Sequence, residues 1–519
     1  MKKFTMEEKN VKDIKTIIKQ LREGKLGESA DIEFKRSTDK LPKSFWETYS
    51  SFSNTFGGYI ILGVTENADG IKISGVSGAS KIIKDMCNTA NNSDKVSYNN
   101  IDNKNINTAP IGDKEIIIIY IPELPMHKKP LYLDGKIGKT YIRKNEGDYI
   151  ATAEDIRRFL RNAHGDLDSE LLSDYSMEDL NQDSILRFKN IIHTRKPSAH
   201  YLEMDNLEFL TQMGVFQIDR DDHRRPKLTV AGLLFLGKLD AIAQKFPHFH
   251  LDYMNKREIQ PGERWKDRVC SGDLEYMEMN LFEYFLIVSE KLRATITDPF
   301  ALDDKSIRKT PVELSTALRE ALANMIIHAD YFDPETELKV IVEDLDYVFI
   351  NPGMMLVSDL QFFTGGKSLP RNNTLIQFFR RMGISDRAGT GGKEIYDMAQ
   401  RNQYQQPELK HDLASTALKI WVGTPTPAQL YPNISSDACK ILECLGFESE
   451  LSSSDIQAET GLSTYFLHKA LDELKKNGLI IVHGKGRATK YNRHISIIEQ
   501  VNAVDEFKDI LLRKNRSRH

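Results

Sequence analysis

The chain has 519 residues, of which 40% are hydrophobic and 28% are charged, and its formal net charge is -4. This length predicts roughly three domains, each large enough to bury its own core. The charge excludes a uniformly basic nucleic-acid binder, so any such affinity must come from local clusters, as at 224–227, 485–490 and 513–519. No apolar run approaches the about 18 residues that cross a bilayer, and the first residues lack the apolar core of a signal peptide. We therefore expect a cytoplasmic protein without a membrane partner.

Cysteine usage points to no metal site. The four cysteines lie at positions 87, 270, 439 and 444, and their spacing matches no common metal-binding pattern. We expect buried free thiols in a reducing compartment.

The first unit, residues 1–165, is predicted as a mixed α/β domain. Helices are expected at 6–23, 42–55 and 152–163, and strands at 59–65, 115–121 and 139–144. A polar, acidic stretch without periodicity follows, which predicts a linker at 166–180. The whole chain is expected to be an α+β multidomain protein.

Three glutamates gather in this first unit. Glu33 and Lys35 alternate with Ile32 and Phe34, so both polar side chains should lie on one surface of a strand. Glu28 precedes that strand, and Glu66 ends the apolar run 59–65. Carboxylates near a basic residue suit a hard cation, Mg²⁺ or Mn²⁺, which supports phosphodiester cleavage. The alternative is ordinary solvated acids paired with lysines.

The segments ESADIEFKRS and SFSNTFGGYIILGVTE resemble the Schlafen core, or AlbA-type DNA-binding domain, over roughly residues 20 to 150. The resemblance implies a metal-dependent endoribonuclease that cuts structured RNA such as transfer RNA. It assigns the catalytic and metal-binding carboxylates to Glu28, Glu33 and Glu66, beside Lys35. Glu66 stands where nucleases of the family usually carry aspartate. Other members only bind nucleic acid.

The closing segment TYIRKNEGD places Tyr141, Arg143 and Lys144 on or near an exposed strand. Basic and aromatic groups of this kind bind phosphates and stack on bases. A solvated strand end is the alternative. We predict Arg143 and Lys144 as nucleic-acid contacts.

The second unit, residues 181–425, contains a helix at 313–331. Its apolar residues repeat at helical spacing, which places Glu320, Asn324 and His328 together on the other face. A glutamate and an asparagine one turn apart can hold a base and a metal ligand toward a triphosphate. A solvated polar stripe is the alternative.

This helix resembles the N-box of the ATPase superfamily (GHKL) that includes gyrase and the histidine kinases, an α/β sandwich. The resemblance implies that Glu320 activates water and that Asn324 binds Mg²⁺ beside ATP. VEDLDYVFINPGMM, GGKSLPRNN and DRAGTGGKEIYDM, in this order, are similar to a divergent branch of that superfamily. Asn351 and Gly353 replace its adenine-reading aspartate motif, so we expect nucleotide binding without hydrolysis. The remaining predicted nucleotide contacts form the loop at the start of a helix, namely Gly389, Thr390, Gly391 and Gly392.

The third unit, residues 433–495, has the pattern of a winged helix-turn-helix. Helices are predicted at 436–447, 453–460 and 463–477, and a strand-turn-strand at 479–492, followed by a basic tail at 496–519. The apolar stripe of the third helix is predicted to comprise Phe466, Leu467, Ala470, Leu471 and Leu474. Its predicted nucleic-acid contacts are Lys469 on that helix and Lys485, Arg487 and Lys490 on the wing. A role in dimerisation or packing is equally compatible.

The sequence thus supports two hypotheses. The first is an ATP-linked endoribonuclease, a homo-oligomer acting in a stress or defence response. The second is a nucleotide-responsive transcriptional regulator that binds DNA without cutting it. They differ in whether Glu28, Glu33 and Glu66 converge on one ion or pair with basic side chains.

Overall fold

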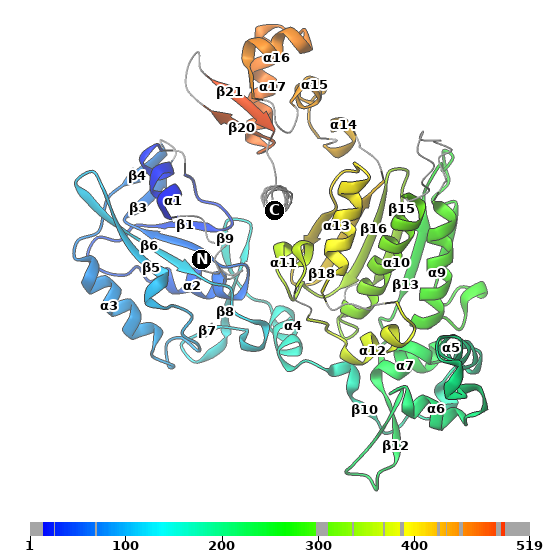
Figure 1. Cartoon of the computed structure of the whole chain (residues 1–519). Coiled ribbons are helices and arrows are strands. Elements are labelled where there is room, and N and C mark those ends of the chain that lie inside the picture. The colour runs from blue at the N-terminus through cyan, green and yellow to red at the C-terminus, as the bar shows by residue number, and fades with distance from the viewer. Residues whose placement is uncertain are drawn as a thin grey trace, which may run out of the picture. The chain divides into compact units, whose positions relative to one another are not determined.

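The fold is given by a computed structural model (Figure 1). It describes residues 14–24, 26–67, 70–296, 310–334, 337–366, 369–384, 389–422, 426–431, 433–445, 450–483 and 489–493. The chain divides into two compact units, residues 1–167 and 168–519. The division lies inside the predicted linker, and the predicted second and third domains both fall in the second unit.

The first unit is built around a four-stranded mixed sheet in the order β1-β2-β6-β5, in which β1 and β2 are parallel. The predicted helices at 42–55 and 152–163 and the predicted strands at 115–121 and 139–144 are present with shifted ends, and the predicted helix 6–23 is described from residue 14 onward. Because the chain turns at Gly63, which has a φ of +88°, the predicted strand 59–65 is instead two strands in different sheets of this unit. Its described elements are α1 (Ile14–Arg22), β1 (Ile32–Lys35), α2 (Phe45–Asn54), β2 (Gly58–Leu62), β3 (Val64–Asn67), β4 (Gly70–Ile73), α3 (Ala79–Ala90), β5 (Ile106–Ile111), β6 (Lys114–Ile121), β7 (Tyr132–Leu133), β8 (Lys136–Lys144), β9 (Gly147–Ile150) and α4 (Ala153–His164).

Both faces of this sheet are covered because its central strands are apolar on both sides. Ile60 and Leu62 pack with residues of α2 and α3 on one face. Tyr59 and Ile61 pack with residues of α1 and β1 on the other. Such strands read as continuous apolar runs, as β2 does.

The predicted linker 166–180 is largely folded into the second unit. Leu171 and Leu172 form strand β10 (Leu171–Leu172) and pair with β12 (Pro226–Thr229). The buried Asp168 carboxylate accepts hydrogen bonds from the N–H groups of Thr374 (2.8 Å) and Leu375 (2.9 Å) at the start of a helix. The composition of the stretch predicts a loose connection, but its aspartate caps a helix 206 positions further along the chain.

The second unit contains a six-stranded sheet in the order β14-β13-β15-β16-β18-β17, in which β13 and β15 are parallel and the other neighbours antiparallel. Its further elements up to residue 422 are α5 (Gln182–Arg195), α6 (Asn206–Gln212), β11 (Phe216–Ile218), α7 (Val230–Leu236), α8 (Leu239–Lys245), β13 (Leu251–Asn255), β14 (Asp267–Cys270), α9 (Leu281–Thr295), α10 (Thr310–His328), β15 (Leu338–Val342), β16 (Asp346–Pro352), α11 (Asp359–Thr364), α12 (Asn373–Arg381), α13 (Gly391–Arg401), β17 (Glu408–His411) and β18 (Ser415–Trp421).

Helix α10 lies between α9 and α13 and packs on β16 (Figure 1). Its predicted apolar face is confirmed, because Leu314, Leu318, Leu322 and Met325 are buried in the main core. The opposite, polar face of α10 is thereby turned toward α13. This packing positions the second candidate site.

The remaining elements form a small cluster with its own core. They are α14 (Pro427–Leu430), α15 (Ser436–Cys444), β19 (Leu451–Ser452), α16 (Ser453–Thr460), α17 (Thr464–Lys476), β20 (Ile480–His483) and β21 (Lys490–Arg493), with the sheet order β19-β21-β20. Leu467, Ala470, Leu471 and Leu474 are buried as predicted. The prediction for Phe466 is wrong: its side chain is 50% exposed and stacks edge-on against Tyr465. Both rings lie in the first turn of α17, beyond the reach of the small core.

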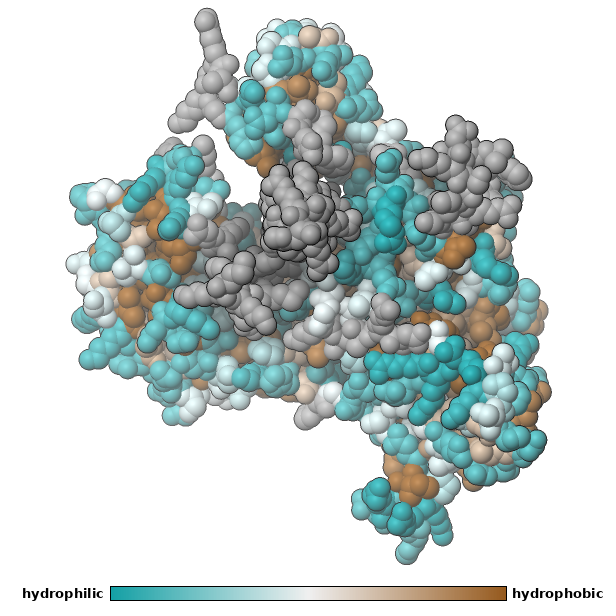
Figure 2. Space-filling model, viewed as in Figure 1, coloured by the Kyte–Doolittle hydropathy of each residue, from teal (hydrophilic) through white to brown (hydrophobic). Residues whose placement is uncertain are grey.

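On the coloured part of the surface in Figure 2, hydrophilic residues predominate and apolar residues form smaller patches between them. Among the described helices, none is long and apolar enough to span a membrane.

Candidate functional site

The three predicted glutamates are neighbours in the first unit. Glu33 lies on β1, Glu28 precedes that strand, and Glu66 lies on β3. The backbone N–H of Glu28 donates a hydrogen bond to Glu66 Oε2 (2.7 Å), and Glu28 Oε1 accepts one from the Phe34 N–H (3.0 Å). The end of β1 is thus tied to the β3–β4 hairpin through carboxylate oxygens.

Glu28 experiences the charge of both other glutamates. Partial burial raises the pKa of the Glu28 carboxyl above its usual value, and the nearby Glu33 and Glu66 carboxylates raise it further. The Phe34 N–H and Lys35 act in the opposite direction. A cation placed among these oxygens would relieve the repulsion, so Glu28 and its neighbours suit a hard divalent ion.

Glu33 is held by basic side chains. Its two oxygens contact Lys35 Nζ (2.7 Å) and Arg143 Nη2 (2.9 Å). Arg143 also contacts Asp148 Oδ1 (3.0 Å) and donates to the Ser29 carbonyl (2.9 Å). The shared surface predicted for Glu33 and Lys35 is confirmed.

The expectation that Arg143 is exposed is wrong. Its side chain is only 3% exposed, and its guanidinium lies over the Phe52 ring. Burial of this cation is compensated by two carboxylates and two backbone carbonyls. Lys144, next in the strand, is exposed as predicted.

The carboxylates gather without the spacing of a formed metal centre. Within the described part of the chain, the residues that bring three metal-ligating atoms within 4.8 Å of one another are His250, Asp252 and Glu337, and not the predicted glutamates. Glu33 is occupied by its basic partners in this conformation. A metal ion bound by all three glutamates would require Glu33 to exchange Arg143 or Lys35 for the ion.

Two glycines fix the backbone next to this site. A Cβ at Gly58 would lie 2.7 Å from the Phe52 ring and 2.9 Å from the Asp31 carbonyl oxygen. Gly57 has a φ of +74°, and a Cβ there would lie 2.8 Å from the Ile121 carbonyl oxygen. The turn from α2 into β2 therefore requires glycine at both positions.

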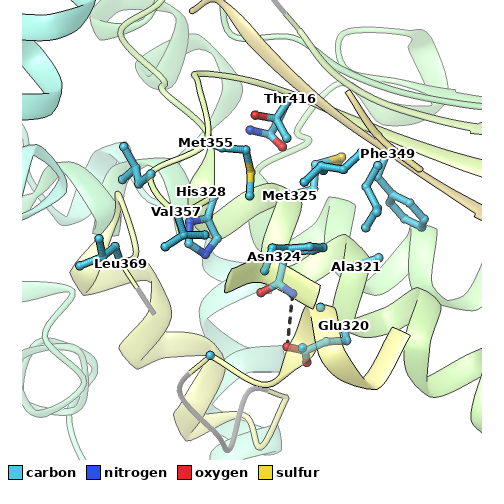
Figure 3. Close-up of a pocket in the computed structure, with 18 of the residues that line it drawn as sticks. Glu320, Ala321, Asn324, Met325, His328, Phe349, Met355, Val357, Leu369 and Thr416 are labelled. Carbon is cyan, nitrogen blue, oxygen red and sulfur yellow. Dashed lines mark hydrogen bonds between the residues drawn. The ribbon is translucent and has the colours of Figure 1, made fainter. Parts of the chain in front are cut away.

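A pocket in the second unit collects most of the predicted nucleotide contacts. It lies between α10, the loop before α13 and strands β16 and β18 (Figure 3). Its predicted lining residues are Glu320, Asn324, His328, Asn351, Gly389, Gly391 and Gly392, and apolar groups that include Met325, Phe349, Met354 and Leu418 complete the wall. A mostly apolar cleft with a few convergent polar groups is typical of a small-molecule site.

The polar face of α10 meets the glycine loop. Asn324 Nδ2 donates a hydrogen bond to Glu320 Oε1 (3.4 Å), and both side chains project from one face of the helix (Figure 3). A Cβ at Gly391 would lie 2.5 Å from that glutamate oxygen and 2.7 Å from the amide nitrogen. The start of α13, whose first N–H groups have no carbonyl partner within the helix, therefore lies in direct contact with the Glu320–Asn324 pair.

Asn351 faces the pocket opposite Thr416, its partner in the β16–β18 ladder. Asn351 Nδ2 donates to the Pro352 carbonyl (3.0 Å), and Thr416 Oγ1 donates to the Gly353 carbonyl (2.8 Å). Gly353 and Thr390 lie beside the pocket and outside its wall. Gly353 packs on Arg371, since a Cβ there would lie 2.6 Å from its guanidinium.

His328 closes one end of the polar stripe. Burial, and to a smaller extent the nearby Arg371 charge, lower the pKa of its imidazole to about 4. Arg371 donates hydrogen bonds to the carbonyls of His328 and Met354. At neutral pH the imidazole is uncharged, so it can serve a ligand as a hydrogen-bonding group but not as a cation.

Thr416 and Arg371 are positions that sequence reasoning missed. Each has a hydrogen-bond partner more than 40 residues away in the chain, His328 for Arg371 and Gly353 for Thr416. The local signal for Arg371 was the stretch GGKSLPRNN, in which it lies.

The predicted nucleic-acid contacts of the third unit are partly described. Lys469 is exposed on α17, beside the exposed rings of Tyr465 and Phe466. Lys490 Nζ lies 3.8 Å from Glu450 Oε2, and both side chains are about half exposed. Lys485, Arg487 and the tail 496–519 lie outside the described residues.

Comparison with protein families identifies three segments. Residues 28–152 match the family "Schlafen, AlbA_2", and residues 343–420 match "Putative ATP-dependent DNA helicase recG C-terminal". Residues 157–252 match a domain of unknown function, DUF8451. The first match contains all three glutamates, whereas α10 lies outside the second.

Two solved structures resemble parts of the chain at low similarity. The DIP2311 protein from Corynebacterium diphtheriae is 13% identical to this chain, with a TM-score of 0.35. The match covers 90% of this chain and 95% of the DIP2311 chain. The N-terminal domain of a RecG-related putative ATP-dependent DNA helicase from Nitrosomonas europaea is 24% identical to this chain, with a TM-score of 0.21. That match covers 28% of this chain and 96% of the solved domain. No curated protein matches the chain. The chain thus contains a Schlafen, AlbA_2 domain and a RecG-type segment, a combination that indicates a nucleic-acid-related function.

Proposed function

We propose that this protein is an ATP-linked, metal-dependent endoribonuclease that cuts structured RNA such as transfer RNA. It would act as a cytoplasmic homo-oligomer in a stress or defence response. The observation that supports the proposal best is the gathering of Glu28, Glu33 and Glu66 inside the Schlafen, AlbA_2 segment. Burial and the Glu33 and Glu66 carboxylates raise the pKa of the Glu28 carboxyl, and a cation bound among them would lower it.

The residues have separable roles in this proposal. Glu28 and Glu66, already linked through a backbone hydrogen bond, would hold Mg²⁺ or Mn²⁺ together with Glu33. The bound ion would polarise a scissile phosphate and activate water. Lys35, once released from Glu33, would contact the same phosphate. Arg143 would hold β8 against the segment before β1 through its contacts with Asp148 and the Ser29 carbonyl.

The pocket of the second unit would bind ATP. Asn324 would hold Mg²⁺ on the triphosphate, and the N–H groups at Gly391 and Gly392 would contact phosphate oxygens at the start of α13. Asn351 lacks the charge of the aspartate that reads adenine in related ATPases, so we propose that ATP regulates the protein without being hydrolysed. The C-terminal cluster, read as a winged helix, would bind nucleic acid.

The test is cleavage of purified total RNA and of DNA by the full chain, with Mg²⁺, Mn²⁺ or EDTA, and with or without ATP. We expect metal-dependent RNA cleavage that Glu33→Gln lowers by at least about a hundredfold, because the variant removes ligand charge with little change of shape. RNA binding should be nearly retained. Glu146→Gln, at an exposed position in the same unit, is the matched control. Equal cleavage by Glu33→Gln and wild type would refute the assigned site.

The second candidate is a nucleotide-responsive transcriptional regulator without nuclease activity. It is favoured by the ion pairs of Glu33 with Lys35 and Arg143, which occupy the carboxylate without a metal. If no nucleic acid is cut under any of these conditions while DNA binding changes with ATP, this second function replaces the first.

A further inference from the structure

A group of polar side chains remains that neither site uses. It lies on the six-stranded sheet, where the start of β13, the end of β14 and the start of β15 meet. Asp252 belongs to the first of these strands and His250 immediately precedes it, Cys270 belongs to the second, and Glu337 immediately precedes the third.

The strand register explains why these side chains share one face. Asp252 is the ladder partner of Cys270 on β14 and of Lys339 on β15. Leu251 and Tyr253, which alternate with them, are fully buried in the main core on the opposite face. His250 and Glu337 lie two residues before Asp252 and Lys339, respectively, so their side chains point to the same face of the sheet. The Leu338 N–H donates a hydrogen bond to the His250 carbonyl (3.1 Å), which continues the pairing of the two strands to these residues.

Three potential ligand atoms converge there, and a fourth, Cys270 Sγ, lies next to one of them. His250 Nε2 lies 3.3 Å from Glu337 Oε2 and 3.8 Å from Cys270 Sγ. One ligand atom each from His250, Asp252 and Glu337 lies within 4.8 Å of the others. For ligand bonds of about 2.0–2.3 Å in a tetrahedron, neighbouring donor atoms are roughly 3.3–3.8 Å apart. The two separations from His250 Nε2 therefore match those of neighbouring donors around one ion, and small side-chain movements would bring Asp252 into the same range.

We propose that His250, Asp252 and Glu337, with Cys270 as the fourth group, form a binding site for a zinc-class transition-metal ion. Imidazole and thiolate ligands favour Zn²⁺ over Mg²⁺ or Ca²⁺, which prefer oxygen alone. The donors come from three adjacent strands, so the ion joins them at one corner of the sheet and acts as a structural clamp. The site is independent of the proposed nuclease and nucleotide functions.

Two cations neutralise the acids when no metal is bound. Arg268 contacts both oxygens of Asp252 (3.0 and 3.1 Å), and Lys339 is paired with Glu337. Asp252 is almost fully buried and can keep Arg268 as a partner while it offers one oxygen to the ion. The Lys339 side chain is 24% exposed and can turn toward solvent. Lys339 is therefore the competitor that metal binding must displace.

The experiment uses the full chain, stripped of metal with EDTA, and Co²⁺ as a spectroscopic probe. We expect one equivalent of Co²⁺ to produce a thiolate-to-cobalt charge-transfer absorption, and Zn²⁺ to abolish it. Cys270→Ser should remove this absorption. His250→Ala and Glu337→Gln should weaken Zn²⁺ binding by about tenfold or more in competition with a chelating dye. Circular dichroism of each variant checks that it is folded.

The controls separate this site from adventitious binding. Cys439→Ser, a second buried cysteine, and His248→Ala, an exposed histidine two residues away, should leave both readouts unchanged. Lys339→Met should tighten Zn²⁺ binding because it removes the competing cation. An absorption that persists in Cys270→Ser, or its absence from the wild type at equimolar Co²⁺, would overturn the proposal and leave the group as an ion-pair cluster. Neither readout requires nuclease activity or ATP.

Discussion

The pKa of the partly buried Glu28 carboxyl depends on the other charged groups of the candidate metal site. Because its pKa is raised above the usual value of 4.5, the unfolded chain releases this proton at a lower pH than the folded chain. The contribution of Glu28 to the free energy of unfolding is therefore fully present below pH 4.5 and is lost as the pH rises through the folded pKa.

We expect Glu28→Gln to raise the melting temperature at pH 7 in EDTA, because the amide can still accept the Phe34 N–H but carries no charge. The gain should disappear near pH 4. With Mn²⁺ added at pH 7 the wild type should gain stability and the variant should not. Thermal unfolding at several pH values measures this, with Glu146→Gln as the control. A gain that does not depend on pH would contradict the electrostatic explanation.

Gly391 lies where the loop before α13 meets the polar face of α10, at the wall of the proposed nucleotide pocket. In Gly391→Ala the new Cβ would meet the Glu320 carboxylate and the Asn324 amide at less than 3 Å. We expect this variant to fold, but we expect ATP with Mg²⁺ to raise its melting temperature by only a small fraction of the wild-type shift. Gly138→Ala, where a Cβ meets no atom within 4 Å, should keep it. Retained stabilisation in Gly391→Ala would show that the ligand does not use this loop.

At the scale of elements, α17 carries an apolar face inward and two aromatic rings outward. Tyr465 and Phe466 are 70% and 50% exposed and lie beside Lys469. Stacking of a base on an aromatic side chain contributes about 1–3 kcal/mol in single-stranded nucleic-acid binding. Rings of this kind next to a lysine suit nucleic-acid contact.

We expect Tyr465→Ala with Phe466→Ala to weaken nucleic-acid binding by about tenfold or more and to change the melting temperature little, because neither ring is buried. Fluorescence anisotropy with single-stranded and duplex probes measures the affinity. Tyr149→Ala, another exposed aromatic residue on β9, is the control. If the double variant binds as the wild type does, the two rings serve a different contact.

At the scale of the whole molecule, the two units have separate hydrophobic cores, and the second unit has the small core of its C-terminal cluster in addition to its main core. The two units should therefore give separate main unfolding transitions. A ligand that binds only the folded state stabilises the unit that holds it, by about 2.7 kcal/mol at a hundred times its dissociation constant.

We expect calorimetry to resolve two transitions, of which ATP with Mg²⁺ raises only the one from the unit of residues 168–519. Asn324→Ala should lose most of that shift, and Glu320→Gln should keep it because a general base contributes less to ground-state binding. If no nucleotide at millimolar concentration moves either transition, the ATP-linked part of the proposed function fails.

The sequence by itself determined the features that depend on local periodicity. Alternation placed Glu33 and Lys35 on one surface of β1, and helical spacing placed Glu320, Asn324 and His328 on one face of α10. The main chain dictates both periods, so neighbouring residues suffice to read them.

The tertiary structure decided which distant residues meet. Arg143 reaches Glu33 across 110 positions, Asp168 caps α12, and His250 meets Cys270 and Glu337. Strand order and register create these contacts, and no spacing along the chain encodes them. For the same reason Cys270, which lies in no metal-binding spacing, becomes a candidate ligand only when three strands pair.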